Sequence, residues 1–153
     1  MNSGLVQSIA ALLNRWRSHF SRSTDSSEHI HVRGARGERL AARFLRQNGY
    51  KVLYRNFEPR RGGQIDIVCR DHDTLVFVEV KTRGTEDFGR PVTAVHRDQQ
   101  RRISLGALTW LRMLDNPDIP FRFDVVEVLM NETAKPHLEL VQNAFELSKP
   151  YRY

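Results

Sequence analysis

The chain of 153 residues contains few of the features that mark several common classes of protein. Its one cysteine, Cys69, excludes an intramolecular disulfide and a metal site built from several cysteines. Cys69 falls in an apolar, strand-like pattern, so we expect a small buried residue and not a nucleophile. No apolar run reaches the roughly 18 residues of a membrane-spanning helix. The N-terminus shows no secretory signal pattern, so we expect a protein of the reducing cytoplasm with no membrane association.

Lysine is also scarce, whereas arginine is abundant. Of the 24 basic residues only four are lysines, and 18 acidic residues leave a net charge of +6. The excess is concentrated in Gly34–Gly62, which holds eight basic and two acidic residues. Guanidinium groups bind phosphate oxygens in pairs and stack on bases, so this cluster favours a polyanionic partner, nucleic acid before a membrane surface. The alternative is a solubilising surface.

The length suits one domain, which we place at residues 34–148, between an extension at 1–33 and a tail at 149–153. Apolar residues at helical spacing between Leu5 and Phe20 predict a short amphipathic helix, and Ser18–His31 predicts a flexible linker. Three interpretations of this extension stay open, namely docking on the domain, binding a partner, or disorder.

The elements of the domain are predicted to follow the order αβββαβ, with a final short strand. The predicted helices are about Ala35–Asn48, ended by Gly49, and about Thr93–Leu114. The predicted strands are Tyr50–Asn56, Gln64–Arg70, Thr74–Thr82, Phe121–Leu129 and an edge strand at Leu138–Val141. Because Leu75–Val80 is apolar on both faces, its strand is expected in the middle of a covered sheet. The fold class is therefore α/β, with helices around one central sheet.

Two acidic residues and a lysine carry most of the functional information. If Gln64–Arg70 and Thr74–Thr82 form a hairpin whose turn centres between His72 and Asp73, Asp66 lies opposite Glu79. Lys81 shares the face of Glu79, because strand side chains alternate with period two. Facing carboxylates repel each other, and a carboxylate in an apolar strand is costly unless it is paired or bound to a metal.

A divalent cation is the simplest explanation for such a pair. Mg²⁺ takes one or two carboxylates together with waters and substrate phosphates, and a metal so held assists phosphodiester hydrolysis. Lys81 would then orient the attacking water or neutralise charge on the scissile phosphate. The alternative is a cross-strand salt bridge on a solvated face, between Lys81 and either Asp66 or Glu79.

Glu38 lies at the edge of the apolar face of the first helix. Helix geometry alone leaves two interpretations open, a carboxylate that extends to solvent and one that points at the site. Between the first two strands, Arg60 and Arg61 precede Gly62 and Gly63. Such a loop suits a phosphate backbone, and an ordinary polar connection is the alternative.

Several motifs occur in the order of a known family. They include Gly34-Ala-Arg-Gly-Glu38, Gly49-Tyr50, Gly63-Gln-Ile-Asp66-Ile-Val, Phe77-Val-Glu-Val-Lys-Thr-Arg83 and Arg122-Phe-Asp124-Val-Val. Over residues 34–128 the chain resembles the YraN family of bacterial proteins. That family is similar to Holliday-junction resolvases and other nucleases of the PD-(D/E)xK, restriction-endonuclease-like fold.

The resemblance implies a restriction-endonuclease-like αβββαβ core, in which helices flank a mixed central sheet. It implies Asp66 and Glu79 as metal ligands for Mg²⁺ or Mn²⁺, Lys81 as the catalytic lysine, and Glu38 as the acid that completes the site. The implied activity is metal-dependent hydrolysis of structured or branched DNA. A homodimer is a further expectation, since the junctions that related resolvases cleave are two-fold symmetric.

Two departures from the family pattern fall near the site. Gln64 replaces the glutamate of a Gly-Glu-Ile-Asp motif, and Gln99 replaces a lysine early in the second helix. They favour an alternative function, a non-catalytic nucleic-acid-binding protein on the same fold. In either case the residues expected to contact nucleic acid are the arginines Arg36, Arg39, Arg43, Arg46, Arg60, Arg61, Arg83 and Arg101.

Overall fold

The computed structural model describes residues 28–60, 62–84, 95–131 and 134–153. The elements follow in the order α2 (Glu28–Gln47), β1 (Lys51–Phe57), β2 (Ile65–Asp71), β3 (Thr74–Arg83), α3 (Arg97–Met113), β4 (Phe121–Leu129) and β5 (His137–Phe145). This is the predicted αβββαβ order with its final strand. The amphipathic helix expected between Leu5 and Phe20 lies outside the described residues. Within the described ranges, no helix is both long and apolar enough to cross a membrane.

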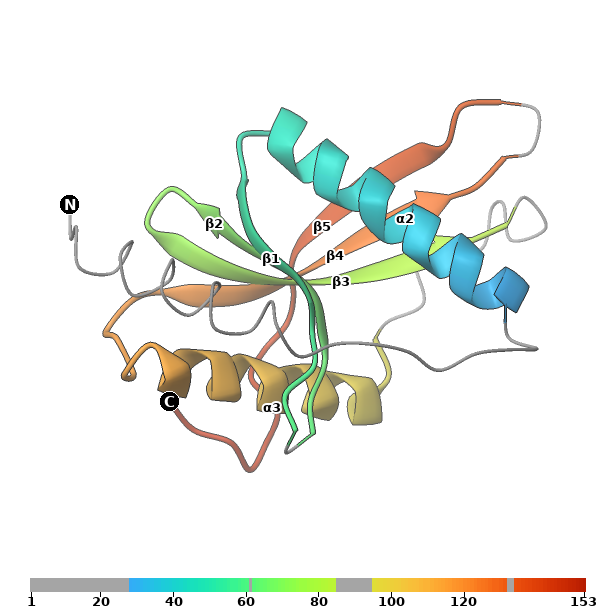
Figure 1. Ribbon diagram of the computed structural model, residues 1–153. Helices are drawn as coiled ribbons and strands as arrows, with labels where there is room; N and C mark the ends of the chain where they lie inside the picture. The colour runs from blue at the N-terminus through green and yellow to red at the C-terminus, as the bar shows by residue number, and fades with distance from the viewer. Residues whose placement is uncertain (1–27, 61, 85–94, 132–133) are drawn as a thin grey trace.

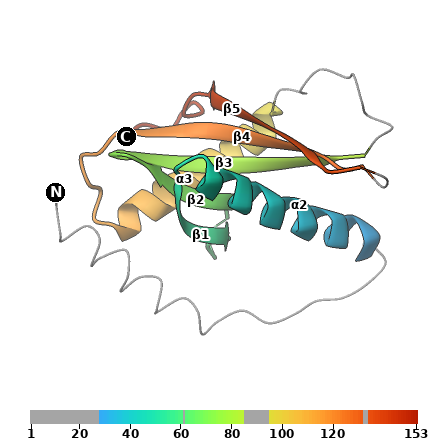
Figure 2. The same cartoon turned by 90° about the horizontal axis from the view of Figure 1, so that it is seen from above.

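The five strands form one mixed sheet in the order β1-β2-β3-β4-β5. Neighbouring strands are antiparallel except β3 and β4, which run parallel. A parallel pair needs a crossover connection, and α3 lies within it. Helix α2 covers one face of the sheet and α3 covers the other (Figures 1 and 2). The apolar strand β3 is central, as its sequence predicted.

Each face of the sheet packs its own apolar cluster. The α3 side is rich in aromatic residues, and the rings of Phe57 and Trp110 meet edge to face with centroids 5.0 Å apart. The α2 side is aliphatic, with Leu45 from the helix against Val78 of β3. Cys69 is fully buried in this second cluster, and burial raises the pKa of its thiol to about 12. It is therefore a packing residue, as expected.

Three element boundaries differ from those predicted by more than one residue. Helix α2 begins at Glu28 instead of Ala35, so the last four residues of the expected linker are helical. Gly34 lies inside this helix, because one internal glycine costs only about 1 kcal/mol relative to alanine and does not end a helix. Helix α3 begins at Arg97 instead of Thr93, because His96 has a non-helical backbone with ψ 148°.

The third difference is at the edge of the sheet. Strand β5 runs over His137–Phe145, well beyond the predicted Leu138–Val141, because pairing with β4 resumes after an irregularity. At that irregularity Asn143 adopts φ 49°, and its N–H donates to Asp124 Oδ1 at 3.0 Å. After the strand, the tail returns to the domain, where the Tyr153 hydroxyl donates to the carbonyl of Pro117.

Candidate active site

The β2–β3 hairpin has the predicted register. Pairing runs from Asp71 with Thr74 to Ile67 with Val78, and one further step in the same register places Asp66 opposite Glu79. Both acids are buried, with 9% and 7% of their surface exposed. The backbone N–H of Val80 donates to Asp66 Oδ2 at 2.8 Å, which ties the aspartate to β3. The hairpin therefore brings two buried carboxylates to one place.

Burial raises the pKa of both carboxyl groups. For Asp66, burial and the negative charge of Glu79 raise the pKa to about 8, although the N–H of Val80 opposes the shift. For Glu79, burial raises the pKa, while the charge and hydrogen bond of Lys81 act against it. Both shifts favour a proton held by the pair of carboxyl groups, which interact through a side-chain hydrogen bond.

Lys81 lies beside Glu79, with its Nζ 3.2 Å from Oε1 of the glutamate. Gln99, from the first turn of α3, contacts both of these side chains. Its Nε2 donates to Glu79 Oε1, and its Oε1 accepts a hydrogen bond from Lys81 Nζ. Gln99 thus lies at the predicted place. The ion pair of Lys81 and Glu79 is not on a solvated face, since their side chains are 26% and 9% exposed.

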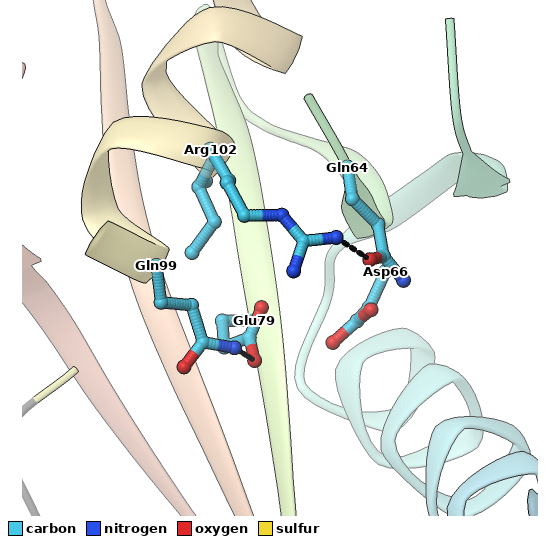
Figure 3. A pocket seen from close by; sticks show the side chains of 6 residues that line it. Gln64, Asp66, Glu79, Gln99 and Arg102 are labelled. Carbon is cyan, nitrogen blue, oxygen red and sulfur yellow. Dashed lines mark hydrogen bonds between the residues drawn. The ribbon is translucent and has the colours of Figure 1, made fainter. Parts of the chain in front are cut away.

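A small cavity of about 40 Å³ opens beside the carboxylates. It is lined by Gln64, Asp66, Glu79, Gln99, Arg102 and Ile103 (Figure 3). The predicted near-site residue Gln64 accepts a hydrogen bond from Arg102, with 2.9 Å between Nη2 and Oε1. The cavity exceeds the roughly 10–15 Å³ that one water requires, so it has room for a few water molecules.

Arg102 is a site residue that the sequence analysis missed. It follows Gln99 by three positions, which places the two side chains on one face of α3. That spacing was the available signal. The predicted Arg101 instead lies in the ion pair with Asp98, at 3.6 Å between Nη1 and Oδ1.

Two glycines allow the start of β2 to approach α3 closely. Gly63 has φ 90°, and a Cβ atom there would lie 2.5 Å from the backbone nitrogen of Gly106. The N–H of Gln64 also donates to the carbonyl of Arg102 at 3.4 Å. The side chains of Gln64 and Arg102 therefore start from backbones that are already in contact.

Glu38 approaches the site from α2. Its Oε2 is buried, finds no hydrogen-bond donor within the described residues, and lies 4.0 Å from Arg55 Nη2. Its negative charge contributes to the raised pKa of Asp66. The preceding Gly37 permits this position, since a Cβ there would lie 1.9 Å from Thr82 Oγ1. The Glu38 side chain is 21% exposed, so it is not extended into solvent, and its site role stays a prediction.

The arginines predicted to contact nucleic acid differ in their surroundings. Five are exposed, four along α2 and one before β2, namely Arg36, Arg39, Arg43, Arg46 and Arg60. Arg61 lies outside the described residues. Arg83, in contrast, is partly buried: its side chain is 14% exposed and its Nε lies 2.7 Å from Glu127 Oε1. The parallel pairing of β3 with β4 brings these two side chains together.

The carboxylates at the cavity are compatible with a hard cation that takes only one or two of its ligands from the protein. Among the described residues, no three histidine, cysteine, aspartate or glutamate side chains are grouped to hold a metal ion. Asp66 and Glu79 supply two carboxylates, which is the number that Mg²⁺ commonly takes when waters and substrate phosphates complete its shell. A site of this kind suits a cation that binds with substrate.

The fold class follows from two features. One is a mixed sheet covered by a helix on each face, and the other is the pair of acids on β2 and β3 followed by a lysine two residues after the second acid. The protein is an α/β protein of the restriction-endonuclease-like fold. The model of the Uncharacterised protein family UPF0102 matches residues 37–128. The chain belongs to this family, which is the YraN family that its motifs resemble.

Its relatives match over most of their length. The chain is 46% identical over 124 residues to the UPF0102 protein of Geobacter sulfurreducens, covering 81% of this chain and 96% of the relative. It is 47% identical over 122 residues to that of Geobacter metallireducens, with 80% and 98% covered. For the UPF0102 protein of Rhodococcus opacus, the identity is 43% over 112 residues, with 73% and 94% covered. The family match includes every residue described above at the site.

Proposed function

We propose that this protein is a metal-dependent nuclease that hydrolyses phosphodiester bonds of structured or branched DNA. The observation that carries the proposal is the convergence of Asp66 and Glu79 at one cavity, with Lys81 paired to Glu79 beside it. Two buried carboxylates are costly to keep together, so a function that needs them explains their position better than stability does. The exposed arginines of α2 would hold the DNA strand through its phosphates.

Each residue has a role in this proposal. Asp66 and Glu79 hold Mg²⁺ or Mn²⁺, which supplies a Lewis acid for the phosphodiester and an acidified water. Lys81 orients the attacking water or neutralises charge on the scissile phosphate. Glu38 adds negative charge behind Asp66, which favours a bound cation. The hydrogen bonds of Gln99 hold Glu79 and Lys81 in their relative positions.

The raised pKa of Asp66 bears on metal binding, because metal ligands bind in their deprotonated form. Asp66 and Glu79 would hold a cation whose charge offsets the two causes of that shift, the burial of Asp66 and the negative charge of Glu79. Two such sites in a homodimer would suit a two-fold symmetric junction.

Titration calorimetry with Mn²⁺ at low salt tests the site, comparing wild type with Asp66→Asn. We expect binding by wild type and none by the variant. Incubation of branched DNA with wild type and Asp66→Ala tests the activity: the variant should lose cleavage and keep DNA binding. Undiminished cleavage by Asp66→Ala, or no Mn²⁺ binding by folded wild type with and without DNA, would contradict the proposal.

A second candidate is a non-catalytic nucleic-acid-binding protein. The observation that favours it is the amide of Gln99, which already occupies Glu79 Oε1 and Lys81 Nζ. In this case wild type would bind DNA with an affinity that falls steeply between about 50 and 200 mM salt. No substrate would be cleaved with Mg²⁺ or Mn²⁺. Cleavage that depends on Asp66 would exclude this candidate.

A further inference from the structure

We infer that Arg102 binds a phosphate oxygen of the substrate, and that Gln64 holds its guanidinium group at the cavity until the substrate arrives. This inference rests on the proposed function, because the phosphate belongs to the bound nucleic acid strand. It extends that function to a residue that neither the motifs nor the family resemblance assigned.

Of the described residues that line the cavity, Arg102 is the one that carries a positive charge. The neighbouring cations are engaged with carboxylates, Lys81 with Glu79 at 3.2 Å and Arg83 with Glu127 at 2.7 Å. Within the described parts of the chain, Arg102 has no carboxylate within ion-pair distance. Its positive charge is thus available to an anion that enters the cavity.

The present partner of Arg102 is one that a phosphate can replace. Gln64 offers a neutral amide oxygen, at 2.9 Å, and both side chains are exposed. A hydrogen bond of this kind contributes about 1 kcal/mol net. A phosphate offers arginine a charge-assisted, paired hydrogen bond of roughly twice that strength. Exchange of the amide for a phosphate oxygen is therefore favourable.

The backbone fixes where Arg102 can reach. The close contact of Gly63 with Gly106 holds the start of β2 against α3. From there the guanidinium group extends over the cavity, between Gln64 and Glu79 (Figure 3). Its positive charge also acts on Glu79, where it opposes the rise in pKa that burial causes. A phosphate that reaches the carboxylates therefore meets a guanidinium group positioned beside them.

The position of Arg102 offsets the repulsion between the acids of the site and a phosphodiester. Negative charge on Glu79 and Glu38 repels a phosphodiester, and Lys81 is already paired with Glu79. A second cation at the cavity, not bound to a carboxylate, supplies attraction where the strand must approach. Arg102 would thus increase substrate affinity at the scissile position, in addition to the affinity that the arginines of α2 give along the strand.

Fluorescence anisotropy with labelled branched DNA tests the inference, with Ca²⁺ in place of Mg²⁺ to prevent cleavage. Arg102→Gln should weaken binding about tenfold at about 100 mM salt. The plot of log affinity against log salt should also become less steep, with the magnitude of its slope smaller by about 1. Arg102→Lys should keep part of the affinity and the slope. Arg112→Gln, at an exposed position in the last turn of the same helix, is the matched control and should have a smaller effect.

Gln64→Ala separates the two parts of the inference. If Gln64 only holds Arg102 at rest, this variant should bind DNA as tightly as wild type or more tightly. A loss equal to that of Arg102→Gln would overturn the role of Gln64. Unchanged binding by folded Arg102→Gln, or an equal loss in Arg112→Gln, would overturn the role of Arg102. Failure of wild type to bind any DNA would instead remove the proposed function, and this inference with it.

Discussion

The side-chain amide of Gln99 joins Glu79 to Lys81, because it donates to the carboxylate and accepts from the ammonium group. Glu79 and Lys81 come from one strand of the sheet, whereas Gln99 comes from the helix that covers it. The relative position of the two charged groups therefore depends on how α3 packs. An amide suits this place, because it can donate to an acid and accept from a base at once.

Gln99→Ala should lower Mn²⁺ affinity, or the rate of any DNA cleavage, by about 10-fold to 100-fold. This is the usual cost of losing a group that orients a metal ligand. Titration calorimetry and a cleavage assay measure the two effects. Gln47→Ala, on the exposed end of α2, is the control and should change neither. Unchanged affinity and rate in Gln99→Ala would mean that the amide only fills space between the two charges.

Asp66 should make the metal-free protein less stable as the pH rises. Its pKa is about 8 in the folded protein, against 3.8 for an unperturbed aspartate. Between these values the folded state holds a proton that the unfolded state has released, so the free energy of unfolding falls with rising pH. The asparagine of Asp66→Asn does not ionise, so the free energy of unfolding of this variant should not fall with pH for this reason. At pH 8 it should be more stable than wild type by at least about 1 kcal/mol, or about 2–4 °C in Tm.

Thermal melting at pH 5 and at pH 8, with a chelator present, measures this difference. The advantage of Asp66→Asn should be larger at pH 8 than at pH 5. Asp73→Asn, in the exposed turn of the same hairpin, should follow the wild-type profile. Parallel pH profiles for wild type and Asp66→Asn would show that Asp66 is ionised in the folded protein over this range.

The hairpin could be predicted from the sequence because its determinants are local. The polar turn at His72 and Asp73 and the alternation of the strands fix which residues lie opposite each other. The central position of β3 followed in the same way, from an apolar pattern on both faces. Asp66, Glu79 and Lys81 could thus be placed together without knowledge of the rest of the fold.

Other features depend on contacts between elements that are distant in sequence. Arg102 reaches the cavity because Gly63 packs on Gly106, and nothing in the spacing of these residues indicates that contact. Arg83 is partly buried because β4 runs parallel to β3 and presents Glu127 to it. Strand direction is not encoded in the pattern of either strand, so this pairing could not be predicted and Arg83 was expected to contact nucleic acid.

Gly63→Ala should test whether the contact between β2 and α3 is needed. A Cβ there would meet the backbone of Gly106, and the φ of 90° is unfavourable for any residue with a Cβ. We expect a loss of more than about 2 kcal/mol in chemical denaturation, since strain and overlap act together. Gly34→Ala is the control, since no atom lies within 4 Å of its Cβ position and the site is helical. It should gain up to about 1 kcal/mol. Equal stabilities for the two variants would contradict this account.

Asp124 is a buried acid whose role is distinct from those of Asp66 and Glu79. It has no exposed surface, and the Nε of Arg122 donates to both of its oxygens, at 3.0 and 3.2 Å. The Nη2 of Arg122 continues to the hydroxyl of Tyr50, at 2.9 Å, and to Asp71, at 2.8 Å. The group joins β4 to the turn of the β2–β3 hairpin. Because every contact is satisfied within the protein, Asp124 is expected to support folding and not chemistry.

Asp124→Ala should therefore destabilise the protein by about 3–5 kcal/mol, since it leaves the largely buried charge of Arg122 with one carboxylate partner in place of two. Urea denaturation measures this, and Asp118→Ala, at an exposed position, should stay within about 0.5 kcal/mol of wild type. Asp124→Asn, which keeps the shape of the side chain, should bind Mn²⁺ like wild type wherever it is folded. Loss of Mn²⁺ binding in folded Asp124→Asn would mean that Asp124 belongs to the candidate site. Retained binding with reduced stability would show that Asp124 stabilises the sheet, whereas Asp66 and Glu79 hold the metal.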